Sequence, residues 1–234
     1  MQTIPITNLV VIALPAIMVL LILWRWSNSA GRSAYALARM VLQLCLIGYA
    51  LTFLFETKSP SLVLLVLTIM VCASSWIALG SVPEQRRNLY FRALLATLVV
   101  NSLLLILITQ VVLDTSPWFA PNIVIPLAGM VFAVGMNGIS LFAERYFAEL
   151  ARTNETNARN IAYKATLIPI TNSLLAVGLV SLPGMMTGQI LSGVSPLIAV
   201  RYQIMIMLMI FTSSGLSSAL FYSLLQSKSS KHKD

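Results

Sequence analysis

The sequence predicts an all-α integral membrane protein with about seven transmembrane helices. Of its 234 residues, 58% are hydrophobic and only 9% are charged, and the mean hydropathy is +0.88. Ordinary soluble domains carry about 25% charged residues. The 15 Lys and Arg residues outnumber the 7 Asp and Glu residues. In a protein that spans a lipid bilayer, this excess indicates basic loops on the cytoplasmic side and does not indicate a nucleic-acid partner.

Seven apolar runs are long enough to cross a hydrocarbon core about 30 Å thick, which takes roughly 20 residues. They cover 7–24, 34–55, 61–79, 93–113, 123–142, 165–182 and 203–225. We expect the first run to remain as a span. It does not read as a cleaved signal peptide, because its basic residues, Arg25 and Arg32, follow it.

The basic residues predict the orientation of these spans. Of the 15, 13 fall in segments that alternate along the chain, namely 25–39, 84–92, 143–164 and 228–234. Lys58 and Arg201 are the two exceptions. Because Lys and Arg concentrate in cytoplasmic loops, we expect the N-terminus outside and the C-terminus inside. The location expected is the cell inner (plasma) membrane, as a multi-pass protein.

The connections between spans are short, so we expect residues 1–234 to form one polytopic membrane domain. The longest polar stretch, ERYFAELARTNETNARNIAYK, lies within 143–164, and we expect it to be a cytoplasmic helix-turn-helix on the inner surface. A solvated connector without a partner is the alternative.

The sequence does not predict an enzyme, and we expect no catalytic residue and no cofactor bound by this chain. The single histidine, His232, lies in the basic tail, and the chain contains no HExxH, no phosphate-binding GxxxxGK[ST] loop and no CxxC. Cys45 and Cys72 lie within apolar runs and are expected to be packed thiols.

Uncharged polar residues lie within the predicted spans, whereas Asp, Glu, Lys and His do not occupy their centres. A relay of buried carboxylates, typical of proton-coupled carriers, is therefore missing, and energy for transport would come from another source. The residues concerned are Gln43, Asn101, Gln110, Asn137 and Asn172. Interhelical hydrogen bonding is their usual role; lining a pathway is the alternative, and we keep Asn137 and Asn172 as pathway candidates.

Two further patterns lie in the second half of the chain. Gly129, Ala133 and Asn137 are four residues apart, which predicts a helical face for close helix contact. The stretch VGLVSLPGMMTGQILSGVSP, 177–196, meets Pro183-Gly184 where a plain span would continue. Such an interruption is tolerated at membrane depth only where protein or a water-filled cavity surrounds it. We therefore expect 183–202 to form an extracytoplasmic gate-like segment.

Long blocks of the sequence resemble the FetB-type permeases, the membrane subunits of a small ABC transporter family linked to iron export in bacteria. The blocks are IPLAGMVFAVGMNGISLFAER (125–145) and TLIPITNSLLAVGLVSLPGMMTGQILSGVSPLIAVRYQIMIM (166–207), with a looser match in LARMVLQL…GY…LF at 37–55. The resemblance implies a permease subunit that pairs with a cytoplasmic ATPase, which uses the ATP, and that forms a homodimer.

The interruption at Pro183-Gly184 predicts roles for individual residues, because an interrupted helix exposes backbone groups that can bind a polar substrate. The predicted pathway comprises Pro183, Gly184, Met185, Met186, Gln189, Asn172 and Asn137. The thioethers of Met185 and Met186 would suit a transition-metal substrate, with adaptable packing at a helix-turn junction as the alternative.

Contact with the ATPase is expected in the cytoplasmic loop, at Glu149, Arg152, Asn154, Glu155 and Arg159. Here the chain departs from the family pattern, because FAEL (147–150) passes through ARTNETNARNIAYK to TLIP (166–169) without the family's LGAT-like stretch. Either 151–160 is a shortened coupling element, or the chain works with a divergent ATPase or with none. A stand-alone carrier or channel and a non-transporting scaffold are therefore the alternatives to an exporter of iron or another metal ion.

Overall fold

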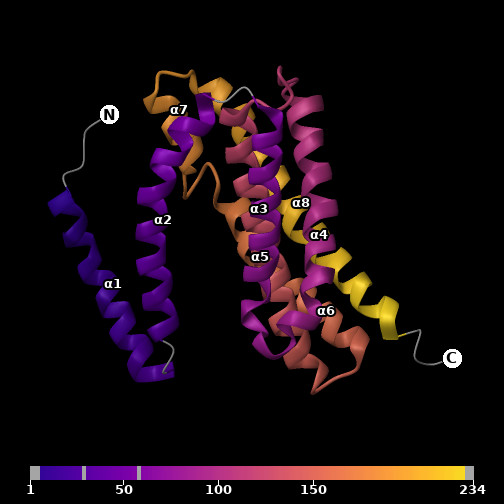
Figure 1. The fold of residues 1–234 in the computed structure, drawn as a ribbon. Coiled ribbons are helices and arrows are strands. Elements are labelled where there is room, and N and C mark those ends of the chain that lie inside the picture. Colours follow the sequence, from indigo (N-terminus) through magenta and orange to yellow (C-terminus); the bar gives the residue numbers. More distant parts are fainter. Residues whose placement is uncertain (1–5, 28–29, 57–58, 230–234) are drawn as a thin grey trace. The chain divides into compact units, whose positions relative to one another are not determined.

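The computed structural model describes residues 6–27, 30–56 and 59–229, and every regular element in these ranges is helical. The chain divides into two compact units, Met1–Thr57 and Lys58–Asp234, whose helices are labelled in Figure 1.

The first unit is a pair of helices, α1 (Ile6–Ser27) and α2 (Ala30–Glu56). Both are apolar enough to cross a membrane, and they coincide with the predicted runs 7–24 and 34–55. Most of their described side chains are exposed within the unit. A helix that is apolar on all sides needs lipid or protein around it, so this pair is built for an apolar environment.

The second unit holds the remaining helices. In chain order they are α3 (Pro60–Ala78), the 3₁₀ turns η1 (Leu79–Ser81) and η2 (Pro83–Gln85), α4 (Arg86–Ile106), the π-helical segment η3 (Leu107–Val112), α5 (Pro121–Leu150), α6 (Glu155–Ala176), α7 (Gly184–Leu191) and α8 (Pro196–Ser229). The 30-residue α5 is the central helix and packs against α3, α4, α6 and α8.

The core of this unit surrounds Phe142 of α5, which is fully buried. Its ring stacks on Tyr146 with centroids 5.6 Å apart, and Phe221 of α8 meets it edge-on at 6.5 Å. Small residues of α4 and α6 let these helices approach the centre: Ala93, Ala96, Ala158 and Ala162. The close contact that small residues allow is the usual basis of helix packing in membranes.

A polar centre joins α4, α5 and α8. The Oδ1 atom of Asn101, which is fully buried, accepts hydrogen bonds from the hydroxyls of Ser213 at 2.7 Å and Ser217 at 3.3 Å. Ser213 also donates to the carbonyl oxygen of Val131 at 2.9 Å. Gly135 of α5 leaves the room that the Asn101 amide occupies. Asn101 therefore has the interhelical role expected of a polar residue within a span.

Unit 2 has two distinct ends, because α5 runs its whole length. At the basic end, η2, the start of α4, the end of α5, the start of α6 and the last turns of α8 line one hollow. Five arginines belong to these parts, Arg86, Arg87, Arg92, Arg145 and Arg159, and Arg152 lies in the connection between α5 and α6. At the α7 end, residues 113–123 lie beside α7 and the first turns of α8. Figure 1 shows α7 and the connection between α5 and α6 at opposite ends of this unit.

Six described helices are long and apolar enough to cross a membrane. They are Val10–Ser27, Ala30–Glu56, Pro60–Ser81, Pro83–Val112, Pro121–Leu150 and Pro196–Gln226. The sixth predicted run, 165–182, is the one without such a helix. In its place α6 begins at Glu155 and ends at Ala176, and its first half carries Arg159 and Lys164, which lower its hydropathy.

Residues 143–164 have the expected order of helix, turn and helix: the end of α5, residues 151–154 and the start of α6. Their position on the inner surface stays a prediction. By contrast, Pro183-Gly184 does not interrupt a helix. The chain leaves α6 at Val177, and Pro183 is the N-cap of α7. Proline suits a helix start because its missing N–H is one that the first turn leaves unpaired.

Candidate functional site

The turn between α6 and α7 carries much of its own hydrogen bonding. The N–H groups of Val180 and Ser181 both donate to the carbonyl oxygen of Ala176, at 2.8 and 3.1 Å, and Gly178 N–H donates to Ser181 O at 3.0 Å. Gly178 has a φ of +84°, a conformation that favours glycine. The turn between α6 and α7 therefore leaves fewer unpaired backbone N–H and C=O groups than the glycines and prolines of 177–196 would indicate.

Next to this turn lies a cavity of about 460 Å³, here called the aspartate cavity. It lies between the 113–120 connection, α5, α7 and α8. Its polar lining includes Asp114, Thr115 and Gln189, and its sulfur-bearing lining comprises Met130, Met185 and Met205. The Oγ1 atom of Thr115 and the Oε1 atom of Gln189 are both buried without a hydrogen-bond partner in the described protein.

A second cavity of about 410 Å³, the glutamine cavity, shares Met130 and Met185 with the first. It extends along α5, α6 and α8, where Ala133, Ser173 and Ile210 line it. Gln203 of α8 also lines it, and its Oε1 atom is buried without a partner while the residue is only 5% exposed. The two cavities thus adjoin at the two shared methionines.

The structure brings together some of the predicted pathway residues. Met185 lines both cavities, Gln189 lines the aspartate cavity and Pro183 lines the glutamine cavity. Gly184 stands beside them in the chain, with open space where a Cβ would lie.

The other pathway candidates lie apart from these cavities. Met186 belongs to the lining of neither cavity. Asn172 of α6 and Asn137 of α5 are exposed on helix surfaces and also lie outside both linings. The part that any of these residues plays in a pathway remains a prediction.

Sequence reasoning missed Asp114, Thr115 and Gln203. Asp114 and Thr115 stand in a short polar connection that looked like an ordinary loop, and Gln203 lies at the edge of an apolar run. The sequence did contain one indication of Asp114: acidic residues are scarce, and Asp114 is the one Asp or Glu between Glu84 and Glu144. Among the described residues, His, Cys, Asp and Glu side chains do not gather in any group of three that could hold a metal.

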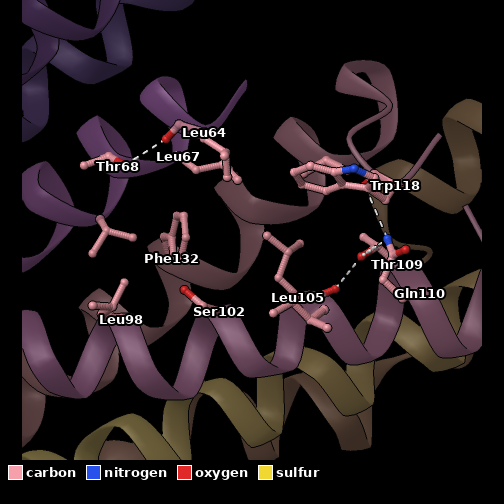
Figure 2. Close-up of a pocket in the computed structure, with 13 residues that line it drawn as sticks. Leu64, Leu67, Thr68, Leu98, Ser102, Leu105, Thr109, Gln110, Trp118 and Phe132 are labelled. Atoms are coloured by element: carbon pink, nitrogen blue, oxygen red, sulfur yellow. Dashed lines mark hydrogen bonds between the residues drawn. The ribbon is translucent and has the colours of Figure 1, made fainter. Parts of the chain in front are cut away.

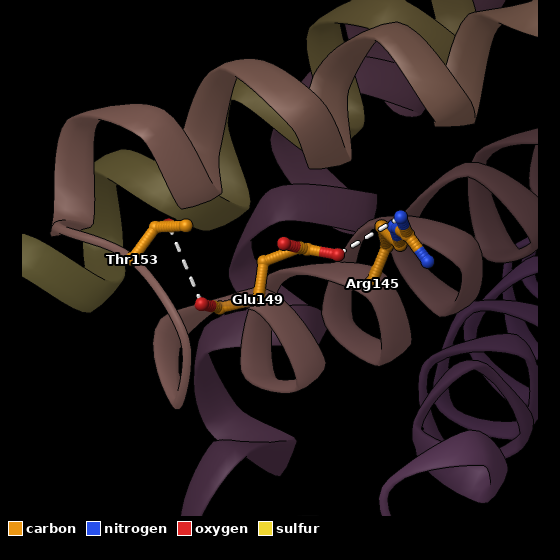
Figure 3. A network of polar contacts seen from close by, with 3 residues as sticks. All are labelled: Arg145, Glu149 and Thr153. Atoms are coloured by element: carbon orange, nitrogen blue, oxygen red, sulfur yellow. Dashed lines mark hydrogen bonds and ion pairs between the residues drawn. The ribbon is translucent and has the colours of Figure 1, made fainter.

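At the basic end, the predicted ATPase-coupling residues make contacts within the chain. Glu149 is 8% exposed and pairs with Arg145, with Oε1 and Nη2 2.8 Å apart. Its carbonyl oxygen accepts from Thr153 N–H at 2.9 Å and from the Thr153 hydroxyl at 3.4 Å. Figure 3 shows the ion pair and the hydroxyl contact. These bonds fix the tight turn that ends α5.

The start of α6 is fixed in the same way. Asn154 is its N-cap, and its Oδ1 accepts from Asn157 N–H at 2.9 Å. Glu155 Oε1 accepts from the Tyr222 hydroxyl at 3.3 Å and from Gln226 Nε2 at 3.1 Å.

Arg159 and Arg152 differ in their surroundings. The Arg159 guanidinium lies 5.7 Å from the centre of the Tyr222 ring and donates to Asn160 Oδ1. Arg152 is exposed, and its side chain makes no hydrogen bond or ion pair with the described residues. Of the five predicted coupling residues, Arg152 is thus the most available to a partner.

A third cavity, of about 440 Å³, lies between α3, α4, η3 and α5 and is mostly apolar. Figure 2 shows its lining, with Thr109 and Gln110 of η3 at one edge near Trp118. Gln110 Nε2 donates to Thr109 Oγ1 at 3.1 Å and to Trp118 O at 3.3 Å, so its amide is engaged within the protein. This cavity suits an alkyl chain better than an ion.

The long apolar helices, the buried polar centre and the adjoining cavities define a polytopic helical membrane protein. Comparison with known families gives its affiliation. The model of the uncharacterised protein family UPF0014 matches residues 6–159 and 155–229, and the chain belongs to this family.

Three relatives illustrate the family. A UPF0014 membrane protein of Synechocystis sp. is 35% identical over 214 residues, which cover 85% of this chain and 83% of the relative. The probable iron export permease protein FetB of Escherichia coli is 30% identical over 202 residues, 79% of this chain and 76% of the relative. The protein ALUMINUM SENSITIVE 3 of Arabidopsis thaliana is 30% identical over 204 residues, covering 80% and 73%. The resemblance to FetB-type permeases is therefore confirmed. No solved structure matches the chain.

Proposed function

We propose that this chain is the membrane-spanning permease subunit of an ABC transporter that exports a metal ion, iron being the first candidate. The observation that carries the proposal is the similarity to FetB, a probable iron export permease, over 79% of this chain. The adjoining aspartate and glutamine cavities support it, because they give a polar substrate a place within the helices. ATP hydrolysis belongs to a separate cytoplasmic ATPase in this proposal.

The proposed topology has seven crossings, with the N-terminus outside and the C-terminus inside. In this arrangement the basic end faces the cytoplasm and the α7 end faces outward, in accord with the positive-inside rule. The seventh crossing is α6 together with the 177–183 turn. The 22 residues of α6 give a length of about 33 Å, and its Arg159 and Lys164 side chains can extend toward the headgroups.

The proposed assembly is a homodimer, because ABC transporters combine two membrane halves. The small-residue face of α5 supports this, since Ala133 and Asn137 are exposed on the surface of unit 2. Gly129 lies differently, because a Cβ there would contact Met70 of α3 at 3.6 Å. Ala133 and Asn137 are therefore the better contact points.

One observation favours a stand-alone carrier or channel as the second candidate. Only four residues, 151–154, connect α5 to α6, and Asn154 is occupied as a helix cap. A partner ATPase would have little surface here beyond Arg152 and its neighbours.

Reconstitution separates the two functions. The chain is purified together with a candidate ATP-binding-cassette protein and placed in proteoliposomes, which are loaded with Fe²⁺ under anaerobic conditions. We expect Fe²⁺ flux that requires ATP and stops when the ATPase is inactivated. Flux at the same rate without ATP would identify a carrier or channel, and a chain that neither binds the ATPase nor moves metal would be a scaffold.

A further inference from the structure

We infer that the aspartate cavity is a binding site for a hard or borderline divalent cation, held by the oxygen atoms of Asp114, Thr115 and Gln189. The role of this site in transport rests on the proposed function. What the site adds is the class of cation and the residues that bind it. The sequence favoured the sulfur atoms of Met185 and Met186 instead.

The first observation is where unpartnered acceptors lie. Five buried side-chain N or O atoms of the described protein lack a hydrogen-bond partner. Two of them, Thr115 Oγ1 and Gln189 Oε1, line the aspartate cavity, and a third, Gln203 Oε1, lines the cavity that adjoins it. A buried polar atom left unpaired costs about 1–3 kcal/mol. Two amide oxygens and one hydroxyl oxygen thus lie beside this pair of cavities without a partner. A cation is a ligand that their lone pairs can bind.

The second observation is the charge of Asp114. Asp114 is an exposed residue that lines the same cavity, and its carboxylate takes part in no ion pair with another described residue. It supplies the negative charge that the two neutral oxygens lack. This charge favours a cation over an anion at the open side of the cavity.

The third observation is the backbone at Asp114, which has a φ of +47°. The π-helical segment η3 ends just before Asp114 in a turn with left-handed backbone. In this turn Leu113 N–H donates to Ile108 O and Thr115 N–H donates to Thr109 O, both at 2.9 Å. Glycine is the usual residue at such a helix end, and Asp is one of the few others that tolerate it. The carboxylate of Asp114 is therefore not required to form this turn. The π-helical segment before it is of a kind that is frequent at functional sites.

The donor chemistry selects the class of cation. Carboxylate, amide and hydroxyl oxygens suit cations such as Mn²⁺ and Fe²⁺, whereas thioethers alone suit Cu⁺. One carboxylate with neutral oxygens gives weak binding, which a transported ion needs in order to leave. Met130 and Met185, which line both cavities, then stand between them as an apolar wall, and Met205 adds to the apolar lining of the aspartate cavity.

The test is equilibrium binding of Mn²⁺ to the purified chain, without ATPase, in nanodiscs of phosphatidylcholine. Free Mn²⁺ is followed by its electron paramagnetic resonance signal, which bound Mn²⁺ loses. We expect Asp114→Asn to weaken binding at least about tenfold, because even outer-shell changes at metal sites cost 10–100-fold. Met185→Leu, which keeps volume, should leave binding unchanged. Glu144→Gln, at an exposed carboxylate of the basic end, is the matched charge control and should also leave it unchanged.

Two isosteric variants keep the test decisive if Asp114→Asn does not fold. Thr115→Val removes the unpartnered hydroxyl, and Gln189→Leu removes the unpartnered oxygen together with the amide nitrogen. Each should weaken Mn²⁺ binding in a protein that elutes as the unaltered chain. Equal binding by all three oxygen variants would overturn the site, as would a loss in Met185→Leu that matches the loss in Asp114→Asn. Because no ATPase is present, failure of ATP-driven transport overturns the proposed function and leaves this result intact.

Discussion

Gly138 of α5 lies directly against Ser214 of α8: a Cβ at position 138 would be 2.9 Å from both the carbonyl oxygen and the hydroxyl of Ser214. Real Cβ atoms essentially never approach another atom so closely. The carbonyl belongs to the α8 backbone, so it cannot rotate away as a side-chain end can. The two helices are in contact only because position 138 has no side chain.

Replacing Gly138 by Ala is therefore expected to push α5 and α8 apart. Overpacking a well-packed core costs about 1–3 kcal/mol, and we expect a lower unfolding temperature in detergent. Gly129→Ala is the matched control in the same helix, because its Cβ would meet only Met70 at an ordinary 3.6 Å. If the two variants unfold at the same temperature, the close α5–α8 contact is wrong.

The hydrogen bond from Ser213 to Asn101 is expected to couple α8 to α4. Both residues are fully buried, and the bond is 2.7 Å long. Interhelical hydrogen bonds in membrane proteins average about 0.6 kcal/mol, with a maximum near 1.7. A double-mutant cycle of Asn101→Ala and Ser213→Ala, measured by reversible unfolding in mixed micelles, should give a coupling in this range. Strictly additive effects would argue against the bond.

Gln203→Leu is expected to leave the protein as stable as before or to stabilise it. The unpaired Oε1 of this buried amide costs about 1–3 kcal/mol, and Leu removes that cost at similar volume. Thermal unfolding in detergent gives the answer, with Gln110→Leu as the comparison, because the Gln110 amide is hydrogen-bonded and its loss should destabilise. A large destabilisation by Gln203→Leu would mean that this amide has a partner.

Asn154 is expected to act as a helix cap, in addition to any contact with an ATPase. Asn154→Ala should cost about 1 kcal/mol of stability because the Asn157 N–H loses its acceptor. Asn154→Ser should restore it, since serine caps about as well. Pull-down of the ATPase by both variants separates the roles: weaker capture with Asn154→Ser, at unchanged stability, would assign the side chain to the partner.

The long apolar helices were predictable because composition and run length decide them. The runs 7–24, 34–55 and 61–79 lie within α1, α2 and the α3–η1 segment. The glycines and prolines of 177–196 predicted a helix break, whereas Pro183 is the residue at which α7 starts. When the residues before and after a proline are both apolar, the sequence does not show whether the proline ends the preceding helix or begins the next one.

The candidate site was predictable only in part. Met185 and Gln189 stood out because they follow an unusual Pro-Gly pair, and both line the aspartate cavity. Asp114 and Gln203 come from other elements, 71 and 18 residues away from Met185 along the chain. Only tertiary packing brings Asp114 to the aspartate cavity and Gln203 to the adjoining glutamine cavity, and no local sequence pattern records it. The bonds that occupy Glu149 and Glu155 likewise depend on turn geometry and on α8.

The crossing of α6 is the feature of the topology that most needs a measurement. Its first half carries Glu155, Arg159 and Lys164, and only the 12 residues 165–176 are free of charge. These give about 18 Å of helix, less than the core thickness of about 30 Å. We therefore expect α6 to cross with its charged half beside α5 and α8, and with the 177–183 turn completing the passage.

Single cysteines placed at the two ends of α6 test this crossing. In a background where Cys45 and Cys72 are replaced, Thr153→Cys lies in the α5–α6 connection and Leu179→Cys lies in the turn, where the residue is 91% exposed. A membrane-impermeant maleimide should label Cys at 179 from outside and Cys at 153 only after the cells are opened. Ser59→Cys and Ser229→Cys, at the start of α3 and the end of α8, should follow the same outside and inside pattern. Labelling of 153 and 179 from one side would mean that α6 does not cross, and the chain would then have six spans with both termini on the same side.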